Sequence, residues 1–323
     1  MNTQSNVSIP SLANFPGFFE TTQQSLDLAD ARLRSGQIAS AMISLIEYLR
    51  RRREEDPQIW PDVARDCRRH AICSLLHSDP FTYRAFSKPR GYAGDAVMMD
   101  YIYGLGEYGE ASKNATSLGR EIFEWDRQQP APKAVRHRRE LLGGFIDDAA
   151  FHGGARVLAV AAGHLREAEL SCALRGGNLE TFVALDQDQE SLAVVARDYA
   201  HLGVRAVPGT VRNVLTRSID LGQFDLVYAA GLFDYLTGPI AGALTCRLFE
   251  MTRPGGRVLI PNFLKGIPDA GYMESFMDWH LIYRDHADMV ALADSLPDSQ
   301  VSECRVFNDP YDTITYLLVT KAH

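Results

Sequence analysis

The sequence predicts an α/β protein in which a Rossmann-like sheet with a C-terminal antiparallel hairpin follows an N-terminal α-helical cap domain. Three observations lead to this fold class. Apolar residues recur at three- and four-residue spacing in the first half, strands and helices alternate after Gly153-Gly154, and two β-rich segments flank a turn at the end. A length of 323 residues corresponds to roughly two domains at about 150 residues each. We expect the domains to cover residues 1–148 and 149–323.

The first half is predicted to be helical. Leucine, isoleucine and methionine recur with helical periodicity over residues 26–33 and 38–49. Further helices are expected over residues 63–76 and 133–146, the last with prolines at its start.

The second half is predicted to form a doubly wound sheet with helices on both faces. We expect strands near residues 156–161, 181–185, 204–208, 224–230 and 256–261, and helices near 166–175, 189–201, 238–251, 271–284 and 286–295. Residues 303–307 and 313–320 flank Asn308-Asp-Pro-Tyr-Asp312 and predict two antiparallel strands at one sheet edge.

The most informative motif lies at the start of this half. Residues 156–160 are an apolar run typical of a buried parallel strand, and Gly163 follows in the turn that opens a helix. The next apolar run ends in Asp186, 20 residues after Arg166. A carboxylate at a strand end beside a close-approaching turn suits the ribose hydroxyls of a nucleoside cofactor.

Composition limits the class of partner. The chain is 46% hydrophobic and 23% charged, and its net charge of −8 argues against a nucleic-acid surface. No apolar run approaches the roughly 18 residues of a membrane span, and the polar start lacks signal-peptide order, so we expect a cytoplasmic protein that contacts no membrane.

Five scattered cysteines without a C-x-x-C pair fit reduced thiols, and no structural or catalytic metal is expected. The expected partner is a small-molecule substrate, with a homodimer left open. The basic runs 50–53 and 136–139 are interpreted as solvated helix faces rather than sites.

The order of motifs resembles that of class I S-adenosylmethionine (SAM) methyltransferases. After the two strands come Gly209-Thr-Val-Arg-Asn213, the segment Phe224–Tyr235, then Arg253-Pro-Gly-Gly256 before a strand. The resemblance covers residues 150–323. A Rossmann dehydrogenase is less favoured because no dinucleotide G-x-G-x-x-G follows the strand predicted near residues 156–161 and because the chain ends in a hairpin.

The resemblance implies SAM as the cofactor, with Gly163 close to its methionine part and Asp186 on its ribose. Ala161 and Leu165 replace two of the three usual glycines. Arg166 is expected to pair with the SAM carboxylate, or alternatively with Glu169. The implied cofactor-binding residues are Ala161, Gly163, His164, Arg166, Asp186, Gln187, Thr210, Val211, Arg212, Ala230, Gly231 and Phe233.

Residues 86–103 and 269–284 resemble segments of a subgroup with an N-terminal helical cap. Some members methylate the carboxylate of 3-hydroxy fatty acids, and others cyclise SAM to azetidine-2-carboxylate. In this resemblance the two segments close the pocket from two sides.

The aromatic residues of these segments are candidates to face the cationic sulfonium, an attraction of about 0.5 to 2 kcal/mol. The alternative for each is ordinary core packing, and a structural role is the alternative for the histidine. The candidate catalytic residues are Tyr92, Asp95, Tyr101, Trp279, His280 and Tyr283, and Arg90 and Arg284 are candidates to bind a carboxylate substrate.

The resemblance implies a SAM-utilising enzyme of bacterial secondary metabolism or signalling. Methyl transfer to a small acceptor comes first, because it is far commoner in the family that the chain resembles. A carboxylate is a suitable acceptor because it is already nucleophilic near neutral pH. Intramolecular cyclisation of SAM to azetidine-2-carboxylate, with release of methylthioadenosine, is the alternative. A SAM-fold binding protein without activity is a third hypothesis.

Overall fold

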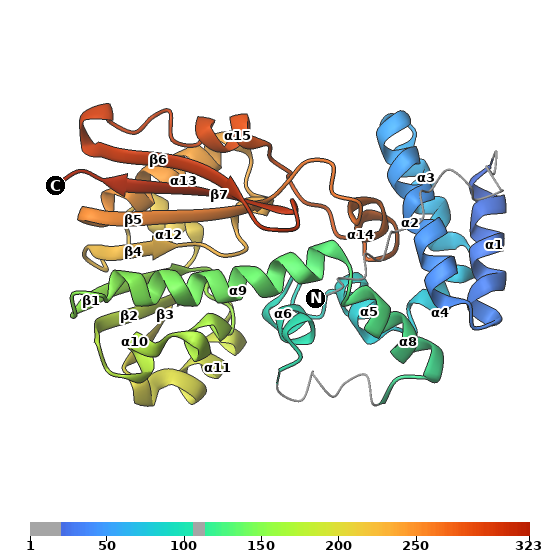
Figure 1. Cartoon of the computed structure of the whole chain (residues 1–323), viewed down its shortest axis with the longest axis horizontal. Coiled ribbons are helices and arrows are strands. Elements are labelled where there is room, and N and C mark those ends of the chain that lie inside the picture. Colours follow the sequence, from blue (N-terminus) through green and yellow to red (C-terminus); the bar gives the residue numbers. More distant parts are fainter. Residues whose placement is uncertain (1–20, 106–113) are drawn as a thin grey trace, which may run out of the picture.

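The computed structural model describes residues 21–105 and 114–323. A sheet flanked by helices occupies one end of the molecule and a helical cluster the other, with the long helix α9 reaching from one to the other (Figure 1). The helices before the sheet are α1 (Thr22–Arg34), α2 (Ile38–Glu55), α3 (Trp60–Arg69), α4 (Ile72–Leu76), α5 (Pro80–Ser87), α6 (Ala96–Tyr103), α8 (Ser117–Asp126) and α9 (Pro130–Ala149).

The sheet has seven strands in the order β3-β2-β1-β4-β5-β7-β6. Its strands are β1 (Ala155–Val160), β2 (Leu179–Asp186), β3 (Val204–Pro208), β4 (Phe224–Tyr228), β5 (Thr252–Phe263), β6 (Val301–Asn308) and β7 (Ile314–Lys321). The first five strands pair in parallel, whereas β7 pairs antiparallel with both β5 and β6. The predicted Rossmann-like sheet with a terminal antiparallel hairpin is therefore confirmed.

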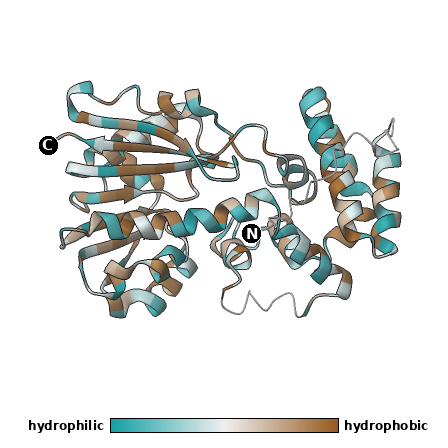
Figure 2. Cartoon of the chain, viewed as in Figure 1, coloured by the Kyte–Doolittle hydropathy of each residue, from teal (hydrophilic) through white to brown (hydrophobic). Residues whose placement is uncertain are grey.

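Burial explains why these segments form strands. The central strands are apolar along most of their length (Figure 2), and both of their faces are covered by helices. The later helices are α10 (Cys172–Arg175), α11 (Gln189–Tyr199), α12 (Val211–Leu215), α13 (Gly238–Glu250), α14 (Ala270–Phe276) and α15 (His286–Ala291), with short 3₁₀ turns η3 (Arg166–Leu170) and η5 (Phe233–Tyr235). No helix in the described ranges is long and apolar enough to cross a membrane.

The helical and sheet regions share one apolar core. Helix α9 packs against β1, β4 and β7, and a single cluster of buried residues runs from α1 and α2 through α6 to the sheet. The expected domain boundary after residue 148 falls at the end of α9, and it remains a prediction.

Four predicted helices are shorter or broken, and the one expected over 286–295 ends at Ala291. Residues 63–76 form two helices, since the backbone turns at His70, whose ring accepts a hydrogen bond from the amide of Ile72. Residues 166–175 divide at Ser171, which caps α10 through the amide of Leu174. The helix expected over 271–284 ends at Phe276, and an irregular segment follows.

Three carboxyl groups are buried together where α5, α8 and α14 meet. Asp79 caps α5, and Asp269 accepts a hydrogen bond from the amide of Ala131 at the start of α9. Burial raises the pKa of both to about 6. Burial also raises the pKa of Asp126 well above its usual value, and the charges of Asp79 and Asp269 add to that effect.

We expect Asp126→Asn to stabilise the protein at pH 8. Carboxyls with raised pKa values favour the folded state when protonated, so their contribution is lost as pH rises from about 4 toward the folded-state values. The asparagine removes that cost. Its melting temperature should exceed that of the wild type by about 2 °C or more at pH 8 and by less at pH 5. The exposed Asp66→Asn is the control, and equal melting curves for wild type and Asp126→Asn at both pH values would contradict the account.

Candidate functional site

A cavity of about 900 Å³ lies at the carboxyl ends of β1, β2 and β4, under the cap segment 90–103. In open α/β sheets, ligands bind just beyond the carboxyl ends of the parallel strands. The predicted residues that line it are Arg90, Tyr92, Ala161, Gly163, His164, Arg166, Asp186, Gln187, Thr210, Val211, Ala230, Gly231 and Trp279. The two segments predicted to form a site are thus brought together.

Asp186 lies at the end of β2 with 6% of its surface exposed. One carboxylate oxygen accepts a hydrogen bond from the amide of Gly163 and the other from the amide of Asp188, both at 2.8 Å. Burial raises its pKa, partly offset by these bonds. Gly163 adopts a left-handed φ of +54°, and an added Cβ would lie 3.2 Å from the Cβ of Ala96 in the cap. The turn after β1 is therefore held between the acid and the cap.

Two other residues of this turn adopt the conformation expected of glycine. Ala161 has a φ of +54° and Leu165 a φ of +53°. A left-handed residue with a Cβ costs about 1–2 kcal/mol, so the surrounding packing must hold the backbone in place. Leu165 is 1% exposed and supplies part of that packing. The substituted motif retains the left-handed turns that its glycines would provide.

Arg166 and His164 are bound by the cap rather than left facing a ligand. Both nitrogens Nε and Nη2 of Arg166 donate to the carboxylate of Asp100 on α6, at 2.8 and 2.9 Å, and Nη1 donates to Asp198 at 2.9 Å. His164 contacts the same carboxylate through Nδ1 at 2.8 Å. The alternative partner Glu169 is also present, 3.3 Å from Arg166. These acids therefore balance the charge of Arg166, which the resemblance had suggested as the partner of the SAM carboxylate.

Arg90 is engaged in a similar way. Its Nη1 donates to Asp188 at 2.9 Å and to Ser191 at 3.0 Å, and lies 3.3 Å from Nε2 of His164. Glu190 lies 3.3 Å from Nη2. Arg90 therefore fastens the cap loop to the start of α11 instead of facing a substrate unpaired.

Aromatic residues close the cavity. The indole nitrogen of Trp279 donates to the hydroxyl of Tyr235 at 2.8 Å. A Cβ added to Gly94 would lie 2.5 Å from that hydroxyl and 2.6 Å from the Trp279 ring, so only glycine fits there. Burial and the nearby charge of Asp186 raise the pKa of Tyr92, which stays a neutral phenol at physiological pH.

The structure places seven predicted site residues outside the cavity. These seven residues, which do not line the cavity, are Asp95, Tyr101, Arg212, Phe233, His280, Tyr283 and Arg284. Asp95 caps α6 and pairs with Arg84, and Tyr101 packs against Phe123 in the core. Phe233 is fully buried in the apolar core beside the sheet.

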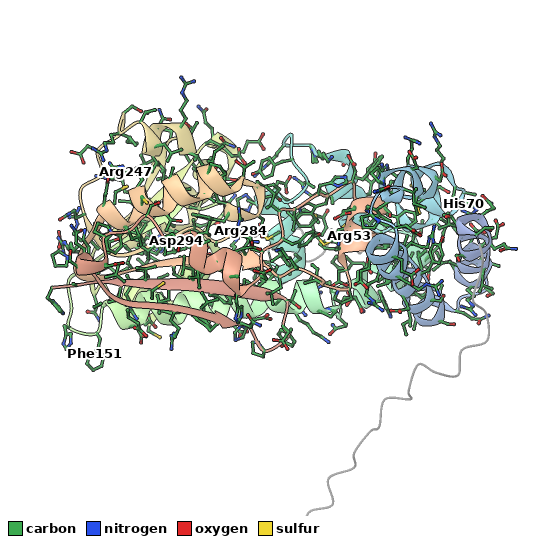
Figure 3. All side chains as sticks on the ribbon, turned by 90° about the horizontal axis from the view of Figure 1, so that it is seen from above. Arg53, His70, Phe151, Arg247, Arg284 and Asp294 are labelled. Atoms are coloured by element: carbon green, nitrogen blue, oxygen red, sulfur yellow. The ribbon has the colours of Figure 1, made fainter. Side chains whose placement is uncertain are left out.

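The other four have equally clear local reasons. Arg284, labelled in Figure 3, is buried, and its guanidinium donates to the carbonyls of Phe233 and Leu236 and to Asn262. The ring of Tyr283 lies under the guanidinium of Arg53. His280 is exposed and pairs with Asp278, and Arg212 is exposed on α12.

Sequence reasoning missed four polar residues of the cavity wall. Glu167, Asp234, Tyr103 and Arg138 line it, although the 136–139 run was interpreted as a solvated face. The helical periodicity of α9 could have revealed that Arg138 is buried. Arg138 lies four residues from both Ala134 and Leu142, on the buried stripe of α9.

The two acids are held inside the protein. Glu167 accepts a hydrogen bond from the hydroxyl of Tyr228 at 2.6 Å, and Asp234 accepts one from the amide of Phe263 at 2.7 Å. Burial raises the pKa of Glu167 and raises that of Asp234 to about 6. Within the described ranges, no group of three or more His, Cys, Asp or Glu side chains could hold a metal ion.

The fold is identified by three features: the strand order, the turn after β1 and the acid that ends β2. The chain has the Rossmann-like sheet with a C-terminal antiparallel hairpin that its sequence predicts. A possible exported protein from Bordetella parapertussis has a similar structure, with a TM-score of 0.57, 15% identity and coverage of 96% of this chain and 100% of that one. That match extends over the helical region as well as the sheet.

More distant likenesses have TM-scores below 0.5. N-methyltransferase NodS from Bradyrhizobium japonicum has a TM-score of 0.40, 11% identity, and coverage of 58% of this chain and 96% of that one. Magnesium protoporphyrin IX methyltransferase from Synechocystis, a structure with bound SAM, has a TM-score of 0.42, 10% identity, and coverage of 59% and 83%. No family model and no curated protein sequence matches the chain.

We expect Ala161→Gly to preserve or raise stability, because glycine adopts the left-handed backbone without steric cost. Ala162→Gly is the matched control, since Ala162 is not left-handed and should only gain unfolded-state entropy. The free energies of unfolding of the two variants should differ by about 1 kcal/mol in favour of Ala161→Gly. Equal losses in urea denaturation would show that the turn is not strained.

Proposed function

We propose that this protein is a SAM-dependent enzyme that transfers a methyl group to a small-molecule acceptor carrying a carboxylate. The observation that carries the proposal is the hydrogen bond from the amide of Gly163 to the carboxylate of Asp186, at the carboxyl ends of β1 and β2. A buried carboxylate with lone pairs left for hydroxyl donors, beside a turn that approaches closely, is what a nucleoside ribose requires.

The residues of the cavity fit SAM part by part. Asp186 would accept both ribose hydroxyls, and the left-handed turn from Ala161 to Leu165 would lie along the methionine part. Thr210, whose hydroxyl is used to cap α12, would present backbone rather than side chain beside the adenine. Bound there, SAM supplies a methyl group activated by its sulfonium.

Positioning is the main contribution of the protein to the reaction. The cap loop, Trp279 and Tyr235 exclude water from the inner cavity, where attacking and leaving atoms must be aligned. His164, the histidine among the described lining residues, is held between Asp100 and Arg90. An acceptor that is already ionised needs no base, which favours a carboxylate.

The size of the cavity bears on the alternative reaction. About 900 Å³ is near the upper end of the range of roughly 300–1,000 Å³ for small-molecule sites. That volume favours a nucleoside together with a second molecule. Cyclisation of SAM alone to azetidine-2-carboxylate needs no such space, and it ranks second.

Asp186→Asn should weaken SAM binding by about 10- to 100-fold in calorimetry, because a charged acceptor of two hydroxyls is lost. Wild-type affinity should fall as pH is lowered, starting at milder acidity than for an ordinary aspartate, because burial raises the pKa of Asp186 and the protonated acid is a poorer acceptor. The variant should lack this pH dependence. Asp298→Asn, exposed on the far edge, is the control, and unchanged affinity of Asp186→Asn would refute the ribose role.

Product analysis by mass spectrometry tests the reaction itself. With SAM and a panel of 3-hydroxy fatty acids of six to twelve carbons, we expect S-adenosylhomocysteine and a methyl ester in equal amounts. With SAM alone, methylthioadenosine and azetidine-2-carboxylate would establish cyclisation instead. SAM that binds without reacting under either condition would indicate a binding protein.

A further inference from the structure

Three arginines line the cavity, and their surroundings differ. Arg90 and Arg166 each have carboxylates within ion-pair distance, supplied by Asp188 and Asp100 among others. For Arg138, no aspartate or glutamate oxygen in residues 21–105 and 114–323 lies within 4.0 Å of its guanidinium nitrogens. One cation of the cavity therefore has no anion of its own in the described protein.

Arg138 is nevertheless buried. Only 5% of its surface is exposed, its Nε has no hydrogen-bond partner, and its Nη2 contacts the sulfur of Met99 at 3.6 Å. The hydroxyl of Tyr103 is its other polar neighbour. A methionine sulfur is a weak acceptor, so this guanidinium has few strong acceptors among the described residues.

The nearest acids interact with this charge but do not pair with it directly. Glu167 and Asp234 are near enough to interact electrostatically, but each is held by other donors of the protein, Tyr228 and the amide of Phe263. A buried arginine without a paired anion is costly, whereas an apolar residue would suit this stripe of α9.

The guanidinium also lies at the cavity wall, beside the segment that follows β4. A Cβ added to Gly231, just after β4, would lie 3.9 Å from Nη2 and 4.0 Å from Nη1 of Arg138. The glycine thus leaves room between the backbone and the guanidinium at a wall of the cavity. A planar carboxylate can accept two parallel hydrogen bonds from such a fork.

We propose that Arg138 is the residue that binds the carboxylate of a small molecule in this cavity. The inference rests on the proposed function, which offers two sources of that group: the methionine part of SAM and the acceptor. In either case Arg138 replaces Arg166, Arg90 and Arg284, which the sequence had suggested for this task.

Calorimetry with matched probes separates the two sources. S-adenosylhomocysteine carries the carboxylate, whereas methylthioadenosine keeps the nucleoside and lacks the amino-acid part. 3-Hydroxydecanoate and its methyl ester differ in the same way for the acceptor. The variants are Arg138→Gln and Arg138→Lys, and Arg136→Gln is the control, because Arg136 lies on the same helix outside the cavity and donates to backbone carbonyls.

We expect Arg138→Gln to lose about 10- to 100-fold in affinity for one carboxylate probe and less than about twofold for its uncharged partner, with Arg138→Lys intermediate. Loss confined to S-adenosylhomocysteine assigns the cofactor carboxylate. Loss confined to 3-hydroxydecanoate assigns the acceptor. Unchanged methylthioadenosine or ester binding shows that the variant is folded.

Two results overturn the proposal. One is that Arg138→Gln binds both carboxylate probes as the wild type does. The other is that all four probes weaken together in the variant and in Arg138→Lys, which makes Arg138 a structural residue. If the wild type binds neither nucleoside, the proposed function fails, and the 3-hydroxydecanoate pair alone decides the role of Arg138. Wild type that binds no carboxylate probe refutes both.

Discussion

The site depends on one buried carboxylate, Asp100 on α6. It is fully buried and accepts two hydrogen bonds from Arg166 and one from His164, both in the turn region after β1. Burial alone would raise its pKa, but these donors lower it, so Asp100 is ionised. Removing one partner of such a buried group typically costs about 3–5 kcal/mol. Helix α6 and the turn after β1 are therefore held together as one unit.

A second contact fixes the other wall of the cavity. Glu274 on α14 accepts hydrogen bonds from Arg53 on α2 and Trp60 on α3, and an added Cβ at Gly271 would lie 2.9 Å from Leu49. The segment that follows α14 brings Trp279 into the cavity. The N-terminal helices thus act on the site indirectly: they position a chain segment that belongs, by sequence, to the sheet region.

The sequence was sufficient for the parts of the molecule that follow local rules. The alternation of strands and helices, the terminal hairpin and the place of Asp186 follow from hydrophobic pattern and turn residues. The partners of the charged residues could not be predicted in this way. An arginine of given local sequence can pair with an acid, as Arg166 does, or have no acidic partner among the described residues, as Arg138 does. Which of these occurs depends on Asp100, 66 residues from Arg166 in the chain, and local pattern carries no record of that contact.

The altered glycine motif is better explained by this packing than by loss of function. Alanine and leucine at positions 161 and 165 have left-handed φ angles of +54° and +53°, so the backbone path does not need glycine if neighbours hold it. Those neighbours are present: Leu165 is buried, and the flanking His164 and Arg166 are bound to Asp100. The cap thus supplies the constraint against which the strained residues are held. The substitutions at positions 161 and 165 therefore do not support the hypothesis of a binding protein without activity. A ligand at this turn would contact the backbone, and the backbone keeps its left-handed conformation.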